Sequence, residues 1–150
     1  MKTFIRPPED YVAMGLLTAI IAVVILCFQS CGVAHASIEP DKIVLAVIGE
    51  AEGCPAIDQE AIARATINRG TLKGVYGYKR ALGVEIAPKS RQRAEKALKQ
   101  ARLRDITDGA NHWLSTWDLK NCREPLIAWR HKMKVTLKTD NFTFYKGARG

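Results

Sequence analysis

Histidine is scarce in this chain of 150 residues, which has only three. His35 lies next to an apolar N-terminal stretch, so only His112 and His131 belong to the part that is expected to fold. Neither stands in a His-x-His or His-Glu-x-x-His pattern, the spacings with which neighbouring histidines hold zinc. The sequence therefore disfavours metal-dependent amidase chemistry, and we expect no metal and no cofactor.

The chain also lacks internal repeats and low-complexity tracts. Its length suits one domain. Setting residues 1–36 aside leaves about 114 residues, enough for one modest core of short helices and a small sheet.

Cysteine is sparse as well, with four in the chain. Cys27 and Cys31 lie in or just after the apolar N-terminal stretch, and Cys54 and Cys122 lie in the part expected to fold. Outside a reducing cytosol the last two could pair, but connectivity cannot be read from sequence. A free buried thiol is the alternative for each.

The N-terminal stretch from Val12 to Phe28 is apolar except for Thr18 and glycine. Lys2 and Arg6 precede it, and a small-x-small pattern resembling a signal-peptidase site follows at 34–36. We predict that 1–36 is a cleaved signal peptide or a membrane anchor over 12–28, with a lipoprotein signal at Cys31 as the weaker reading. Each reading places a single domain over 37–150 outside the cytoplasm, periplasmic or secreted, or anchored in the inner membrane.

Charge is unevenly distributed along the chain. Residues 37–60 carry a net −5 and residues 61–150 a net +13, which account for the +8 of the whole chain because 1–36 sum to zero. A basic body favours a polyanionic partner through long-range attraction. Anionic wall polymer, anionic lipid and nucleic acid all fit that description, and a merely solvated surface is the alternative.

Apolar periodicity and helix-ending residues predict short helices followed by a hairpin. Pro40 suits the first turn of an apolar helix that runs to about Glu52, where Gly53 and Pro55 stop it. The glycine-rich stretch 70–89 is predicted to be a loop. The other predicted elements are a helix over 58–72, a helix over 91–104 capped by Ser90, a turn-rich segment over 105–118, a short helix over 125–132, and strands over 133–138 and 141–145 that turn at 140–141.

Glu50 is the candidate catalytic residue because it follows an apolar run over 43–48. Burial disfavours the charged form of a carboxylic acid, and an acid that stays protonated near neutral pH is what glycoside cleavage uses. The pattern predicts an enzyme that cuts sugar polymers. A solvated helix-end acid is the alternative reading of Glu50.

Two other functions compete with this prediction. Cys54 precedes a predicted helix, whose dipole lowers the pKa of a thiol, and His112 could serve as its base in a peptidase. The second alternative is a membrane-tethered basic module that binds without catalysis. Four aromatic residues could pack in the core or stack on sugar rings: Trp113, Trp117, Trp129 and Tyr145.

Residues 49–69 resemble the opening motif of the spore-cortex-lytic (SleB-type) cell-wall hydrolases. The matching positions are Gly49, Glu50, Ala51, Gly53, Pro55, Gln59, Ala61, Ala63, Asn68 and Arg69. The segments 108–113 and 144–146 resemble two later motifs of that family, so the resemblance spans about 42–147. The chain departs from the family pattern at Glu52, Cys54, Asp58 and Phe142.

The resemblance implies an α+β fold, a small lysozyme-like helical domain with a short C-terminal β-hairpin, preceded by the apolar N-terminal helix. It implies a peptidoglycan-cleaving glycosidase of the lytic transglycosylase or muramidase type, in cell-wall remodelling or phage lysis, with Glu50 as its single general acid/base. The implied substrate-binding residues are Gln59, Asn68, His112, Trp113 and Tyr145.

A transglycosylase needs no second carboxylate, whereas hydrolysis would need one, for which Glu52, Asp58 and Glu60 are the nearby options. The expected partners are peptidoglycan and, through the N-terminal segment, a membrane. We expect a monomer and no nucleic acid.

Overall fold

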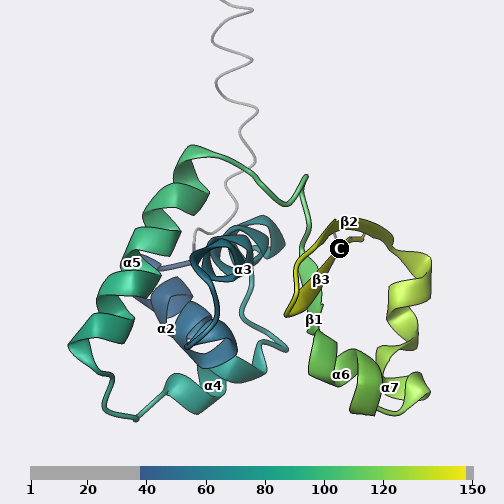
Figure 1. The fold of residues 1–150 in the computed structure, drawn as a ribbon, viewed down its shortest axis with the longest axis horizontal. Coiled ribbons are helices and arrows are strands. Elements are labelled where there is room, and N and C mark those ends of the chain that lie inside the picture. The colour runs from purple at the N-terminus through teal and green to yellow at the C-terminus, as the bar shows by residue number, and fades with distance from the viewer. Residues whose placement is uncertain (1–37, 148–150) are drawn as a thin grey trace, which may run out of the picture. The chain divides into compact units, whose positions relative to one another are not determined.

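The computed structural model of this chain describes residues 38–147 (Figure 1). Four helices come first: α2 (Pro40–Ala51), α3 (Ala56–Arg69), α4 (Tyr76–Ala81) and α5 (Pro88–Leu103). They are followed by β1 (His112–Ser115), α6 (Thr116–Asn121), α7 (Glu124–Ile127), the 3-10 helix η1 (Ala128–Lys132), β2 (Lys134–Lys138) and β3 (Phe142–Lys146). The predicted α+β class is confirmed.

The core forms where α2 packs between its neighbours. Val44 and Val47 of α2 are almost fully buried, as expected for a helix that is apolar nearly all round, and Ile62 of α3 is buried with them. α5 covers the outer side of α2 and α3 and buries its alanines there, while β1 lies on the other side of α3 (Figure 1). Phe144 of β3 completes the core from the sheet.

The sheet has three antiparallel strands in the order β1-β3-β2. β2 and β3 form the predicted hairpin, with an irregularity between Val135 and Leu137. β1 pairs with the other edge of β3, so that His112 lies opposite Tyr145. This pairing carries the segment after residue 110 against the helical core.

Three of the predicted boundaries were wrong. The stretch 70–89 is not all loop, because it contains α4 and the start of α5. Ser90 is not a cap, since α5 begins at Pro88 with Ala87 as its N-cap residue, and proline suits a first helical position. The helix predicted over 58–72 begins at Ala56 and ends at Arg69, because Gly70 takes a left-handed conformation with φ 70°.

The structure bears on the cysteines but not on the N-terminal segment. Within residues 38–147, Cys54 and Cys122 are free thiols and do not pair with each other. The predicted signal peptide or anchor over 1–36 lies outside the described residues. Within residues 38–147, no helix is both long and apolar enough to cross a membrane.

Candidate active site

A cleft of about 600 Å³ contains Glu50. One wall comes from the ends of α2 and α3 and the start of α4, and the other comes from β1, α6, α7 and η1. Its lining residues are Glu50, Arg69, Gly74, Tyr76, His112, Trp113, Leu114, Asp118, Cys122, Leu126, Ile127, Trp129 and Met133.

Glu50 is half-buried in the last turn of α2 and is held by α4. The backbone N–H of Gly77 donates a hydrogen bond to Glu50 Oε1 at 2.6 Å. Gly77 comes this close because neither it nor Gly49 has a side chain: a Cβ on either glycine would overlap the backbone of the other. Among residues 38–147, no side chain or backbone group is hydrogen-bonded to Oε2, which leaves that oxygen available for proton transfer.

Arg69 places a cation in the same wall, at the end of α3. Its Nη2 donates to the carbonyl of Lys73 at 2.7 Å, which fixes the guanidinium near the start of the α3–α4 loop. Burial lowers the pKa of Arg69, and the nearby charge of Glu50 acts in the opposite direction. A half-buried arginine in a cleft is suited to binding anionic or strongly polar groups.

The opposite wall presents His112 on β1. Its Nδ1 lies 2.9 Å from Oδ1 of Asn111. That oxygen also accepts the N–H of Gly147 at 3.0 Å. An amide oxygen can only accept, so His112 carries a proton on Nδ1 and its Nε2 is the free acceptor in the neutral ring. Burial lowers the pKa of His112, and Arg69 lowers it further, which favours that neutral ring near pH 7.

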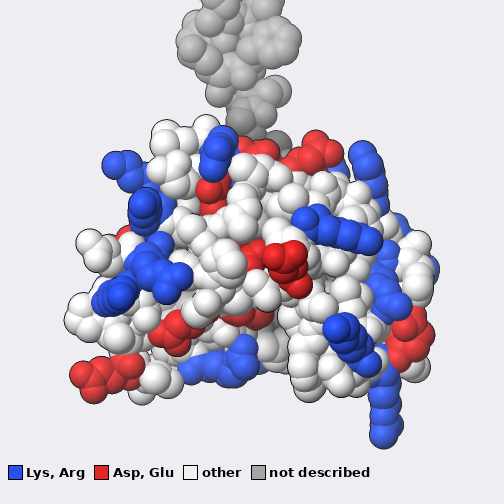
Figure 2. Space-filling model, viewed as in Figure 1, with Lys and Arg blue, Asp and Glu red and all other residues white. Residues whose placement is uncertain are grey.

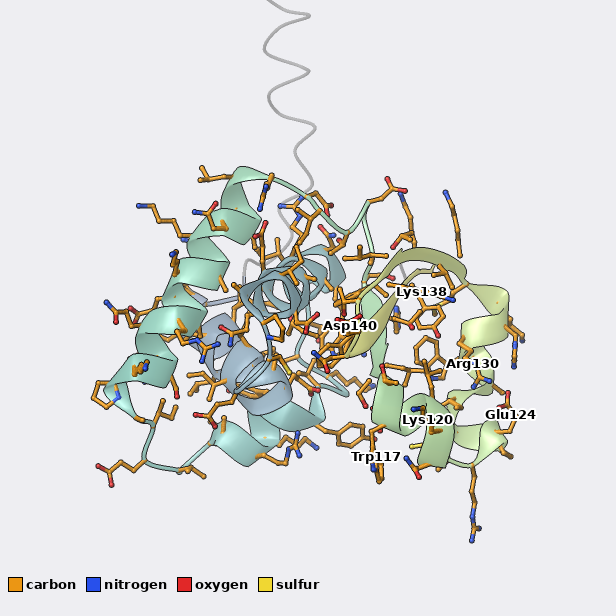
Figure 3. The ribbon with its side chains drawn as sticks, in the orientation of Figure 1. Trp117, Lys120, Glu124, Arg130, Lys138 and Asp140 are labelled. Atoms are coloured by element: carbon orange, nitrogen blue, oxygen red, sulfur yellow. The ribbon has the colours of Figure 1, made fainter. Side chains whose placement is uncertain are left out.

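The ring of Trp129 packs against that of His112, with centroids 5.2 Å apart and planes inclined by 46°, and it contacts Tyr145 in a T-shaped arrangement with centroids 5.5 Å apart. η1, which carries Trp129, is fastened to α7 by Glu124 (Figure 3). Glu124 accepts from Arg130 at 3.0 Å and contacts His131 Nε2 at 2.6 Å. These contacts lower the pKa of Glu124, with the His131 contact as the main cause.

The predicted substrate-binding residues fall into two groups. His112 and Trp113 line the cleft. Gln59, Asn68 and Tyr145 do not line it and make internal contacts. Tyr145 is buried at 4% exposure and lies behind the cleft wall.

Gln59 and Asn68 each donate hydrogen bonds to backbone carbonyl groups. Gln59 Nε2 donates to the carbonyls of Ala51 and Cys54, both at 3.2 Å, and so caps the end of α2 that bears Glu50. Asn68 Nδ2 donates to the carbonyl of Ala110 at 3.0 Å and to Asp105 Oδ2 at 3.1 Å, which ties α3 to the segment before β1.

Carboxylates in the cleft are limited to two among the described residues, Glu50 and Asp118. Asp118 forms a capping box at the start of α6, where its Oδ2 accepts from Ser115 Oγ at 2.7 Å and from the Ser115 N–H at 3.2 Å. The three acids considered as a second carboxylate lie elsewhere. Glu52 is exposed outside this lining, Asp58 is buried against Asn141, and Glu60 pairs with Arg104.

The proposed Cys54–His112 pair is not brought together in the cleft, since His112 lines it and Cys54 does not. Burial, helped by the charge of Asp58, raises the pKa of the Cys54 thiol. That direction is opposite to the lowering expected from the helix dipole, because desolvation disfavours the charged thiolate. Among residues 38–147, no group of three or more potential metal ligands gathers.

The sequence reasoning missed Tyr76, Leu126 and Met133 as cleft residues, and gave Trp129 only as one of four candidate aromatics. Tyr76 was missed because it lies in the stretch predicted to be loop. The only local feature that could have drawn attention to it is an aromatic residue directly before a glycine. Leu126 and Met133 reach the cleft through the fold of α7 and η1, which no local pattern predicts.

The chain is similar in fold to a solved structure. The catalytic domain of the Bacillus cereus SleB protein superposes with a TM-score of 0.53 and 20% identity, covering 77% of this chain and 99% of that one. No protein-family model and no curated protein sequence matches the chain. The described residues all belong to one compact unit of the chain. The described residues of this chain therefore have a SleB-like fold.

Proposed function

We propose that the chain is a peptidoglycan-cleaving glycosidase in which Glu50 is the acid and base. The observation that carries the proposal is the position of Glu50 in the cleft, with Oε1 held by Gly77. The motif around Glu50 resembles that of the SleB-type cell-wall hydrolases, and the SleB-like fold agrees with this resemblance. A fold alone does not specify a reaction, whereas the residues of the site do.

The geometry suits a carboxylic acid that donates from Oε2. In the neutral acid, Oε1 is the carbonyl oxygen, which accepts the Gly77 N–H, and Oε2 carries the proton. Donation of that proton to the glycosidic oxygen lets the bond between that oxygen and the anomeric carbon break. The carboxylate that results then acts as a base in the second step.

We propose the transglycosylase variant of this reaction. The C6 hydroxyl of the same sugar bonds to its anomeric carbon, and Glu50 takes the hydroxyl proton, which restores the acid. This variant needs no second carboxylate. It fits a cleft in which the other acid, Asp118, already accepts three hydrogen bonds, from Ser115 Oγ, the Ser115 N–H and the Cys122 thiol. Hydrolysis in the muramidase manner would require Asp118 to leave its capping box and activate a water.

The remaining cleft residues are proposed to bind the glycan. His112 offers Nε2 as an acceptor for a sugar hydroxyl, and Trp113 and Trp129 offer apolar faces. Gln59, Asn68 and Tyr145 are proposed to act by positioning α2 and β1 rather than by touching the substrate. Location outside the cytoplasm, with 1–36 as signal peptide or anchor, and a monomeric state are parts of the same proposal.

The test is digestion of purified sacculi by residues 37–150, followed as loss of turbidity. Glu50→Gln keeps an oxygen for the Gly77 N–H, but its amide N–H is far too weakly acidic to protonate the glycosidic oxygen, so it should lose at least about a thousandfold in rate. Glu52→Gln removes an exposed acid two residues away and should digest at the wild-type rate. Digestion by Glu50→Gln at the rate of Glu52→Gln would rule out Glu50. Binding without digestion by the wild type would favour the non-catalytic module.

A further inference from the structure

The outer face of α5 carries a row of lysines. Lys89, Gln92, Lys96, Lys99 and Leu103 follow one another at spacings of three and four residues, all of them exposed. Such spacing places side chains in one line along a helix. The opposite face is buried through Ala94, Ala97, Leu98 and Ala101. The row therefore points away from the core, and Lys and Arg recur along this side of the molecule in Figure 2.

The lysines of this row are not neutralised within residues 38–147. None of the three takes part in an ion pair there, whereas Arg104 at the end of the helix is paired with Glu60 at 2.7 Å. Segment 82–104 holds seven bases and two acids, Glu85 and Glu95, for a net +5. Neither acid belongs to the row. Like charges along one helix face are destabilising, and an anionic partner would remove that cost.

Exposed apolar side chains lie at the C-terminal end of the row and in the loop that leads into α5. Leu103 is 73% exposed at its C-terminal end. In the α4–α5 loop, Leu82 is 50% and Val84 is 61% exposed. Single exposed apolar residues are common on soluble proteins. A soluble anionic polymer would bind the lysines but would gain little from leucine and valine, whereas a bilayer offers both charged headgroups and an apolar boundary.

We propose that this face, made of Lys89, Lys96, Lys99 and Leu103 with Leu82 and Val84, docks on an anionic lipid bilayer. The cations attract phosphate headgroups, and the three apolar side chains enter the headgroup boundary. Eleven residues, 29–39, separate the predicted anchor over 12–28 from the start of α2. A chain of that length spans at most about 40 Å, so an anchored domain would stay within reach of the bilayer.

Docking through α5 leaves the cleft accessible. No residue of α5 or of the α4–α5 loop lines the cleft that contains Glu50. A bilayer-bound domain could therefore still take a glycan strand. The proposal concerns a second surface and does not depend on the reaction at Glu50.

The test is sedimentation of residues 37–150 with vesicles, which excludes any contribution from the apolar N-terminal segment. Vesicles of equal parts phosphatidylglycerol and phosphatidylcholine should bind the domain, and vesicles of phosphatidylcholine alone should not. The triple variant Lys89→Gln, Lys96→Gln, Lys99→Gln should weaken binding by about a hundredfold, because each lysine contributes roughly fivefold at such a surface.

A matched triple variant distinguishes a specific effect of this face from an effect of total charge. Lys120→Gln, Lys132→Gln, Lys138→Gln removes the same number of charges from exposed positions on α6, η1 and β2, two of which are labelled in Figure 3. It should bind nearly as the wild type does. Equal loss in both triple variants, or equal binding to both kinds of vesicle, would overturn the proposal.

The apolar part has its own test. The double variant Leu82→Ser, Val84→Ser should weaken vesicle binding several-fold and leave binding to soluble polyphosphate unchanged. If the double variant binds vesicles as the wild type does, and soluble polyphosphate displaces the wild type from vesicles, the partner is an anionic polymer and the bilayer proposal is wrong. Thermal unfolding of every variant confirms that the domain is still folded.

Discussion

Gly49 and Gly77 lie in backbone contact where α2 meets α4, so close that a Cβ on either would overlap the other's backbone. The contact brings the Gly77 N–H to Glu50 Oε1. It is reinforced by Arg80, whose Nη2 donates to the Gly49 carbonyl at 2.8 Å. The catalytic candidate is thus positioned by backbone from a helix that begins 26 residues later in the chain, at Tyr76.

Gly49→Ala is expected to lower the free energy of unfolding by about 3 kcal/mol or more, because neither backbone can yield to the added carbon. Sacculus digestion should fall with it, since the Gly77 N–H moves away from Glu50. Gly83→Ala is the control: unlike Gly49, that glycine has a positive φ, 77°, but no atom lies within 4 Å of the added carbon. It should cost only about 1 kcal/mol. Equal costs in urea unfolding would contradict the packing argument.

Asp105 organises the segment that leads into β1. Its Oδ1 accepts from the Thr107 N–H at 2.8 Å and from Thr107 Oγ1 at 2.6 Å, and its Oδ2 lies 3.2 Å from Arg64 Nε. Burial alone would raise its pKa, but these contacts and Asn68 outweigh burial and lower the pKa from 3.8 to about 2.

Asp105 should therefore make stability depend on pH in the acid range. Its contribution is fully present above pH 3.8 and is lost as the pH falls toward 2, because the folded state then has to take up a proton against these contacts. Asp105→Asn should lower stability by about 1–2 kcal/mol at neutral pH and flatten this part of the curve. Asp108→Asn removes the charge of an exposed neighbouring acid and should keep the pH dependence of the wild type. The measurement is the free energy of unfolding at a series of pH values from about 5 to about 2.

Tyr76 is expected to bind the glycan from the rim of the cleft. It lines the cleft, is 74% exposed and directly precedes Gly77. Tyr76→Ala should raise KM by roughly three- to tenfold with little change in kcat, and Tyr76→Phe should resemble the wild type because the ring is kept. Trp117→Ala removes an aromatic ring that is 67% exposed and does not line the cleft. A change in KM for Trp117→Ala as large as that for Tyr76→Ala would argue against a specific role for Tyr76.

Asn141 links the hairpin turn to the helical core. Its Nδ2 donates to Oδ2 of the buried Asp58 at 2.7 Å, and its carbonyl accepts the Thr116 N–H at 2.7 Å. Asn141→Ala should cost about 2–3 kcal/mol, because Asp58 would lose the hydrogen bond to its Oδ2, and its Oδ1 has no partner among residues 38–147. Adding Asp58→Ala should recover part of that loss. A double variant as unstable as the sum of both single variants would show that the two side chains are not coupled.

Glu50 and the apolar helix that carries it could be predicted because their signals are local. Pro40, the run over 43–48 and Gly53 fix α2, and the matching positions around Glu50 lie on α2 and α3. The hairpin was predictable for the same reason, since β2 and β3 alternate and a polar turn joins them.

The rest of the site depends on contacts between distant residues. α4 was missed because Gly77 reads as a helix breaker, whereas here the missing side chain allows the contact with Gly49. β1 was missed because its register is set by β3, with His112 opposite Tyr145. Gln59 and Asn68 matched the motif, but their role in holding backbone carbonyls becomes visible only when the helices are packed.

The most direct test of the account is mass spectrometry of the products that residues 37–150 release from purified peptidoglycan. The account predicts fragments that end in an anhydro sugar from the wild type, and no fragments from Glu50→Gln. Fragments with ordinary reducing ends would show that the reaction is hydrolysis, and Asp118 would then be the candidate for the second carboxylate. Fragments from Glu50→Gln at the wild-type yield would contradict the central claim that Glu50 is the acid.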